Sequence, residues 1–109
     1  MTIKILEEKL GKKIATAMAS AFLDDTKDIG AAIGDCVTQR NAARLRELCH
    51  KLAGCCASIG DNDSRMLCRS IEDSGDNQSW EQTEAMYKTL SDSLSKTRDS
   101  LENYLKQSV

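Results

Sequence analysis

Apolar residues recur at spacings of three and four along most of this chain, as they do in helices that bury one face. No segment shows the clear alternation of a strand, and the sequence contains no proline. We therefore expect an all-α protein. The predicted helices cover Met1 to Leu10, Lys12 to Arg40, Ala42 to Ile59, a fourth stretch that begins after Asp61 or Asn62 and ends near Gly75, and a last stretch from Ser79 to Leu105.

The links between the predicted helices are short, so neighbouring helices should run antiparallel. We expect an antiparallel four-helix bundle, with residues 1–109 as one domain and the short first helix as a lid over one end. A polar break at Asp24 to Thr26 interrupts the second helical pattern. It is either the start of a new helix or a solvated turn of one long helix. Gly30 and Gly34 either let another helix approach closely or lie on the surface.

The charge and hydropathy of the chain narrow the class of protein. The 109 residues carry a net charge of −2 with no clustered basic face, so a nucleic-acid partner is not expected. No apolar run is long enough to span a membrane, and no signal peptide is visible. We expect a cytoplasmic domain without membrane contact of its own, either free or at the cytoplasmic end of a membrane-bound sensor.

The five cysteines are an odd number, and each lies within a predicted helix. This is typical of small core residues in a reducing compartment and not of a disulfide framework. No C-x-x-C or H-x-x-x-H pair is present, so the sequence predicts no metal site.

The only histidine, His50, lies on the predicted helix from Ala42 to Ile59. Its position is about 140–180° from the middle of the apolar stripe on a helical wheel, so the imidazole should point away from the core. A neutral imidazole is a good nucleophile near neutral pH, because its ordinary pKa is about 6.5. The alternative is a surface histidine without a role. The apolar stripe consists of Leu45, Leu48, Leu52, Cys55 and Ile59, widened by Cys49 and Cys56.

The sequence around His50 resembles the histidine-containing phosphotransfer (Hpt) domain. That family has the pattern H-x-L-K-G, five residues and a glycine, followed by a helix with L-C-R-x-L-E. The family lysine three residues after the histidine is replaced by Ala53, and Ser64 stands where the family usually has an apolar residue. The matching residues are His50, Leu52, Gly54, Ile59 and Gly60 in the first half, and Leu67, Cys68, Arg69, Ile71 and Glu72 in the second.

The resemblance implies a function in a two-component phosphorelay. His50 would accept a phosphoryl group from an aspartate of a response-regulator receiver domain and pass it to an aspartate of another receiver. The partner receiver would bring Mg²⁺, and the domain itself would need no cofactor and have no kinase activity. The implied partners are receiver domains and an upstream sensor histidine kinase. The domain would be a monomer, either free-standing or the last domain of a hybrid sensor kinase.

A phosphorylated histidine gains a charge near −2, so a nearby cation should help to hold it. Since Ala53 cannot provide one, Arg46, one helical turn before His50, is the first candidate, and Lys51 is the second. Both are otherwise ordinary surface charges. We expect a receiver to dock beside His50 over Ala53, Gly54, Ala57 and part of the second helix.

Two other functions remain open at this point. The chain is either a helical docking module that binds receivers or other partners without carrying phosphate, or a structural bundle with an incidental histidine. The missing lysine at position 53 supports the first of these. A hydrolase is disfavoured, because the sequence places no serine or cysteine nucleophile with an orienting carboxylate around His50.

Overall fold

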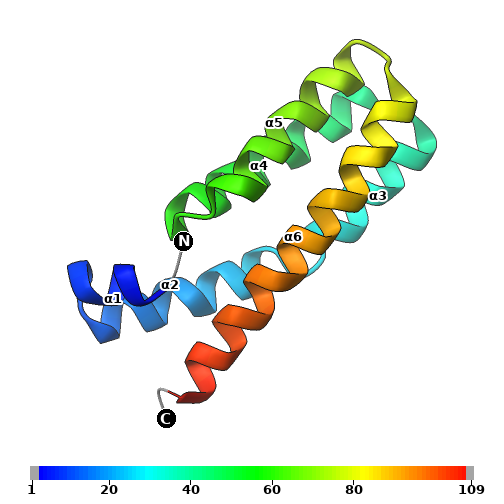
Figure 1. Ribbon diagram of the computed structural model, residues 1–109. Coiled ribbons are helices and arrows are strands. Elements are labelled where there is room, and N and C mark those ends of the chain that lie inside the picture. The colour runs from blue at the N-terminus through cyan, green and yellow to red at the C-terminus, as the bar shows by residue number, and fades with distance from the viewer. Residues whose placement is uncertain (1–2, 108–109) are drawn as a thin grey trace.

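The computed structural model describes residues 3–107, and this part of the chain is helical almost throughout (Figure 1). It is an elongated antiparallel bundle with extents of 44 × 20 × 19 Å, which confirms the predicted fold class. Met1, the first residue of the predicted first helix, lies outside the described residues. The helices are α1 (Ile3–Leu10), α2 (Lys12–Asp25), α3 (Ile29–Gln39), α4 (Ala42–Ile59), α5 (Asn62–Asp76) and α6 (Trp80–Gln107).

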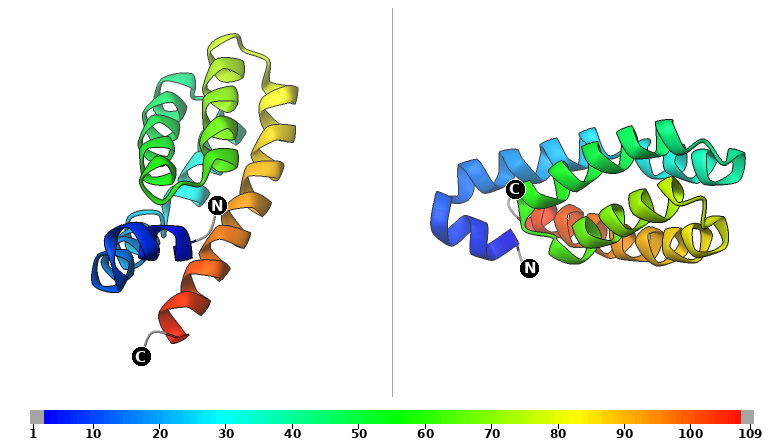
Figure 2. Two further views of the ribbon diagram at one scale, coloured as in Figure 1. Left: turned by 60° about the vertical axis from the view of Figure 1, so that its left-hand side comes forward. Right: turned by 90° about the horizontal axis from the view of Figure 1, so that it is seen from above.

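The four legs of the bundle are α2 with α3, α4, α5 and α6 (Figures 1 and 2). Helix α6 is the longest and packs against α1, α2, α3 and α5. Helix α1 folds back along α2 at one end of the molecule, where Tyr104 of α6 donates a hydrogen bond to Glu7 over 2.6 Å. Buried apolar side chains from all six helices form the core. Within the described residues, no helix combines the length and the apolar character needed to cross a membrane.

Of the two alternatives for the polar break, the start of a new helix is confirmed, and one long helix from Lys12 to Arg40 is wrong. Helix α2 ends at Asp25 and α3 begins at Ile29. Within the turn Thr26 is only 4% exposed, whereas Lys27 and Asp28 are exposed. The Thr26 hydroxyl donates to the carbonyl of Phe22 over 2.6 Å. Nη1 of Arg98 on α6 donates to the carbonyl of Leu23 over 3.1 Å and to Oγ1 of Thr26 over 2.7 Å. Side chains thus satisfy the end of α2, and α6 holds the break in place.

Gly34 on α3 allows α6 to approach closely. A Cβ atom at this position would lie 2.6 Å from the hydroxyl oxygen of Tyr87, which is inside van der Waals contact. The same hydroxyl donates a hydrogen bond to the carbonyl of Gly30 over 3.1 Å. A Cβ atom at Gly30 would meet nothing within 4 Å. Of the two alternatives for this glycine pair, close approach therefore holds for Gly34, whereas at Gly30 a side chain would have open space.

Helix α4 begins and ends where the sequence predicts. The side chain of Asn41 accepts a hydrogen bond from the backbone N–H of Arg44 over 3.1 Å, which satisfies one free donor of the first turn. Gly60 ends the helix with φ of +78°, a conformation that glycine adopts at little cost. Asp61 then caps α5 by accepting from the N–H of Ser64 over 3.1 Å. This two-residue link turns the chain directly from α4 into α5.

Helices α5 and α6 are joined by buried polar side chains. The hydroxyls of Ser64 and Ser93 lie 2.7 Å apart, and those of Ser74 and Thr83 lie 2.6 Å apart. Ser64 is completely buried, so the apolar residue that the family usually has there is replaced by a hydroxyl with a partner on α6. Among the described residues, no buried side-chain nitrogen or oxygen lacks a hydrogen bond.

All five cysteines are free, and four of them are buried. Burial raises the pKa of Cys49 to about 12 from an ordinary value of 9.0. The pKa of Cys68 is raised by a hydrogen bond with Cys56 and by burial. Folding therefore keeps these thiols protonated at pH values where they ionise in the unfolded chain.

We expect the protein to lose stability in alkaline solution. The unfolded Cys49 thiol ionises near pH 9, and the folded one only near pH 12, so unfolding releases a proton between these values. The free energy of unfolding should fall by up to about 1.4 kcal/mol per pH unit for this thiol above pH 9. Urea unfolding between pH 8 and 10.5 measures the slope. Cys49→Ala is the control, and an equal slope in this variant would contradict the assignment.

Candidate functional site

His50 lies on the exposed face of α4. The buried face of the same helix carries the apolar stripe, with Leu45 and Leu52 completely buried. The imidazole forms no side-chain hydrogen bond or ion pair with any residue between positions 3 and 107. Its ring nitrogens are therefore available to a reagent or partner from solution.

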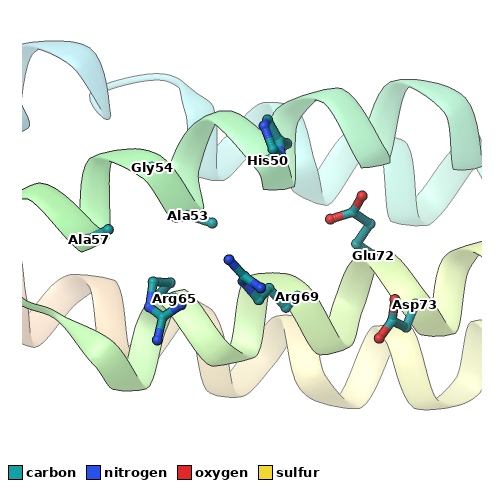
Figure 3. A pocket seen from close by; sticks show the side chains of 8 residues that line it. All are labelled: His50, Ala53, Gly54, Ala57, Arg65, Arg69, Glu72 and Asp73. Carbon is teal, nitrogen blue, oxygen red and sulfur yellow. The ribbon is translucent and has the colours of Figure 1, made fainter.

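An open hollow of about 410 Å³ extends from His50 along the seam between α4 and α5. Figure 3 shows the side chains of the two helices facing this space. Small residues of α4 and charged residues of α5 form most of its wall. The lining consists of His50, Ala53, Gly54 and Ala57 from α4, and Arg65, Arg69, Glu72 and Asp73 from α5.

The three small residues predicted to follow His50 lie at different depths. Ala53 is only 8% exposed and forms part of the floor, whereas Gly54 and Ala57 are exposed. A Cβ atom at Gly54 would meet nothing within 4 Å, so packing within the described chain does not require glycine here. A glycine in mid-helix costs about 0.5–1 kcal/mol relative to alanine. The absence of a side chain at Gly54 therefore suits a surface that a partner has to approach closely.

Arg46 and Lys51, the two predicted cations, lie outside this hollow. Arg46 donates from Nη2 to Oδ1 of Asp76 on α5 over 2.7 Å, and this hydrogen bond, with the charge of the carboxylate, raises the pKa of Arg46. Lys51 lines a second hollow, of about 430 Å³, on the α2 side of α4. Whether either residue supports a phosphoryl group stays a prediction.

The charged residues of α5 beside His50 were not predicted as site residues. Arg69 and Glu72 were recognised only as parts of the second family motif, and Arg65 was not singled out. Their spacing puts Arg65, Arg69 and Glu72 on one edge of α5, while Cys68 and Ile71 are buried. This edge, combined with the short antiparallel turn after α4, is the signal that would have placed them opposite His50.

Along the seam, the residues of the two helices face one another in a regular order. In Figure 3 Arg65 lies on the side of Ala57, Arg69 extends from α5 toward Ala53, and the carboxylate of Glu72 extends toward α4 near His50. The ion pair between Arg46 and Asp76 continues the same antiparallel sequence by one turn.

The site therefore combines an exposed imidazole, two guanidinium groups and two carboxylates in one hollow. A guanidinium group binds phosphate or carboxylate oxygens through paired N–H donors, so the hollow is suited to an anionic group carried next to His50. Within residues 3–107, no three His, Cys, Asp or Glu side chains are grouped so that they could hold a metal ion.

Comparison with known families gives one match. The family model described as the Hpt domain matches residues 17–107, which span α2 from its middle to the end of α6. No curated protein and no solved structure matches the chain significantly.

Proposed function

Because this chain belongs to the Hpt domain family, whose members carry out histidine phosphotransfer in phosphorelays, we propose that His50 is its phosphoryl acceptor. The phosphoryl group would come from an aspartate of one receiver domain and pass to an aspartate of another. The observation that carries this proposal is the exposed, unbonded imidazole at the edge of a hollow that contains two guanidinium groups.

The reaction needs an unprotonated ring nitrogen. This nitrogen attacks the phosphorus of the aspartyl phosphate, the N–P bond forms, and the P–O bond to the aspartate breaks, so that the carboxylate leaves with the electron pair. Positioning and charge stabilisation supply most of the rate in such transfers. The receiver's Mg²⁺ would neutralise charge on the phosphoryl oxygens. Transfer to the second receiver reverses these steps.

Glu72 is the candidate positioning residue for the imidazole. Its half-buried carboxylate lines the same hollow as His50 and extends toward α4 (Figure 3). The Glu72 carboxylate makes no hydrogen bond to the imidazole in this structure, but by accepting one from a ring N–H during transfer it would fix the tautomer and leave the other nitrogen free to attack. It also stabilises the positive charge that the ring gains when the N–P bond forms.

The receiver would dock over Gly54. This residue lines both the hollow beside His50 and the second hollow, whose other wall comes from Met18, Ala21 and Phe22 of α2. A partner that covers His50 from this side meets no side chain at Gly54 and reaches α2 directly. This is the docking surface that the sequence predicted beside the histidine.

The decisive experiment is transfer from a phosphorylated receiver. We would mix a panel of ³²P-labelled receivers with the protein and test the label for acid lability and base stability, which distinguish phosphohistidine from phosphoserine. Peptide mapping then locates the label, which we expect on His50. Receivers that bind the protein and never label it would instead support the docking module. Acid-stable label would contradict the proposal.

A further inference from the structure

We propose that Arg69, assisted by Arg65, binds the phosphoryl group on His50 from the opposite helix and replaces the lysine that is missing at Ala53. This inference rests on the proposed function of His50 and adds the residues that hold the phosphorylated state. The inference rests on the seam between α4 and α5, where Ala53, the position on α4 that lacks the family lysine, faces Arg69 on α5.

The first argument is geometric. Ala53 stands where the family has lysine, and Arg69 extends toward it across the seam (Figure 3). Ala53 is short and buried, so the space above it is open to the guanidinium of Arg69. The family pattern has an arginine at the position of Arg69 as well as the lysine, so this chain keeps the cation of α5 and lacks only the one of α4.

The second argument concerns charge. Arg46 is bound to Asp76, and Arg98 is bound to the break between α2 and α3. In contrast, neither Arg65 nor Arg69 forms a side-chain hydrogen bond or salt bridge with the described residues. Like charges four residues apart on a helix repel each other, and a bound anion would remove this repulsion. Both guanidinium groups are thus free to bind one.

The carboxylates in the hollow do not satisfy the arginines. Glu72 extends toward α4 near His50, and Asp73 points away from Arg69 (Figure 3). With these two carboxylates and the two guanidinium groups, the hollow is close to neutral before phosphorylation. A phosphoryl group then adds a charge of about −1.5 to −2, and paired N–H donors of a guanidinium match its oxygens. Arg69 is nearer to His50 along the seam, so it should contribute more than Arg65.

The test phosphorylates His50 without any receiver. Phosphoramidate transfers its phosphoryl group to the exposed imidazole, and ³¹P NMR follows the second ionisation of the phosphoryl group with pH. A bound cation lowers this pKa. We expect Arg69→Gln to raise it by about 0.5–1 unit and Arg65→Gln to raise it by less. The matched control Arg44→Gln removes the same charge from an exposed position of α4 and should leave the pKa unchanged. Arg46→Gln and Lys51→Gln measure the contribution of the two cations that the sequence offers.

A rescue variant separates phosphoryl binding from a structural role. In Ala53→Lys combined with Arg69→Gln, the cation returns to α4, and the pKa should return toward the wild-type value. No change in Arg69→Gln, a shift in Arg46→Gln or Lys51→Gln alone, or failure of phosphoramidate to label His50 would overturn the inference. Because no receiver takes part, failure of transfer from receivers would count against the proposed function and leave this result standing.

Discussion

The His50→Gln variant is expected to lose all acid-labile label, a reduction of roughly 10³-fold or more, to the limit of detection. Glutamine has a similar size but no nucleophilic nitrogen, since its amide lone pair is delocalised. The labelling assay with phosphorylated receivers measures this loss directly. The phosphoramidate reaction provides a second measurement that does not depend on finding the correct receiver.

Loss of the fold would not explain this result. His50 is exposed and makes no side-chain hydrogen bond with the described residues, so the substitution should change the free energy of unfolding by less than about 0.5 kcal/mol. Circular dichroism and urea unfolding check this directly. Binding of receivers to His50→Gln should also persist, because the docking surface is intact. Label that remains acid-labile in this variant would place the acceptor on another residue.

A Gly54→Gln variant is expected to transfer phosphoryl groups about 100-fold more slowly while remaining folded. The new side chain would meet nothing within 4 Å at its Cβ and would project from α4 toward an approaching receiver. Displacement of the reacting atoms by about 1 Å can cost 10²-fold in rate. The helix itself should gain up to about 1 kcal/mol, because glycine is a poor helix former. Rapid-quench transfer assays and thermal unfolding measure the two effects.

Two controls make the interpretation specific to docking. Gly30→Gln introduces the same side chain at another helical glycine with open space at its Cβ, on α3, and should not slow transfer. Phosphoramidate is small enough to reach His50 past the glutamine, so it should label Gly54→Gln at the normal rate. Transfer from receivers at the wild-type rate in the folded variant would refute docking over Gly54.

Local chemistry explains which parts of the fold the sequence predicted correctly. Both ends of α4 depend on neighbours within a few residues, namely the cap at Asn41 and the left-handed Gly60. The break after α2 depends on Arg98, which is 72 residues from Thr26 along the chain. A helical pattern contains no information about such a distant donor, so the residues alone left two alternatives open there.

The same distinction applies to the site. The exposed position of His50 follows from the periodicity of one helix, and the structure places it as predicted. Arg46 looked free in the sequence because its partner Asp76 is 30 residues away, on the next helix. Arg65 and Arg69 are found beside His50 only because α5 packs against α4 in the fold. The exposure of a residue on one helix could be predicted from the sequence, whereas contacts between side chains of two helices could not.

The buried hydroxyl pairs between α5 and α6 set the register of these two helices. Ser64 and Ser74 are ten residues apart, as are their partners Ser93 and Thr83, so both pairs satisfy one antiparallel alignment. Sliding α5 by one turn, about 5.4 Å, would break both pairs and leave the buried hydroxyl of Ser64 without a partner, at a cost of about 1–3 kcal/mol. Ser74 and Thr83 would keep their hydrogen bonds to carbonyls of their own helices. The two hydroxyl pairs therefore fix the height of α5 on α6, and, because only two residues link α5 to α4, they also fix the height of the histidine helix on α6.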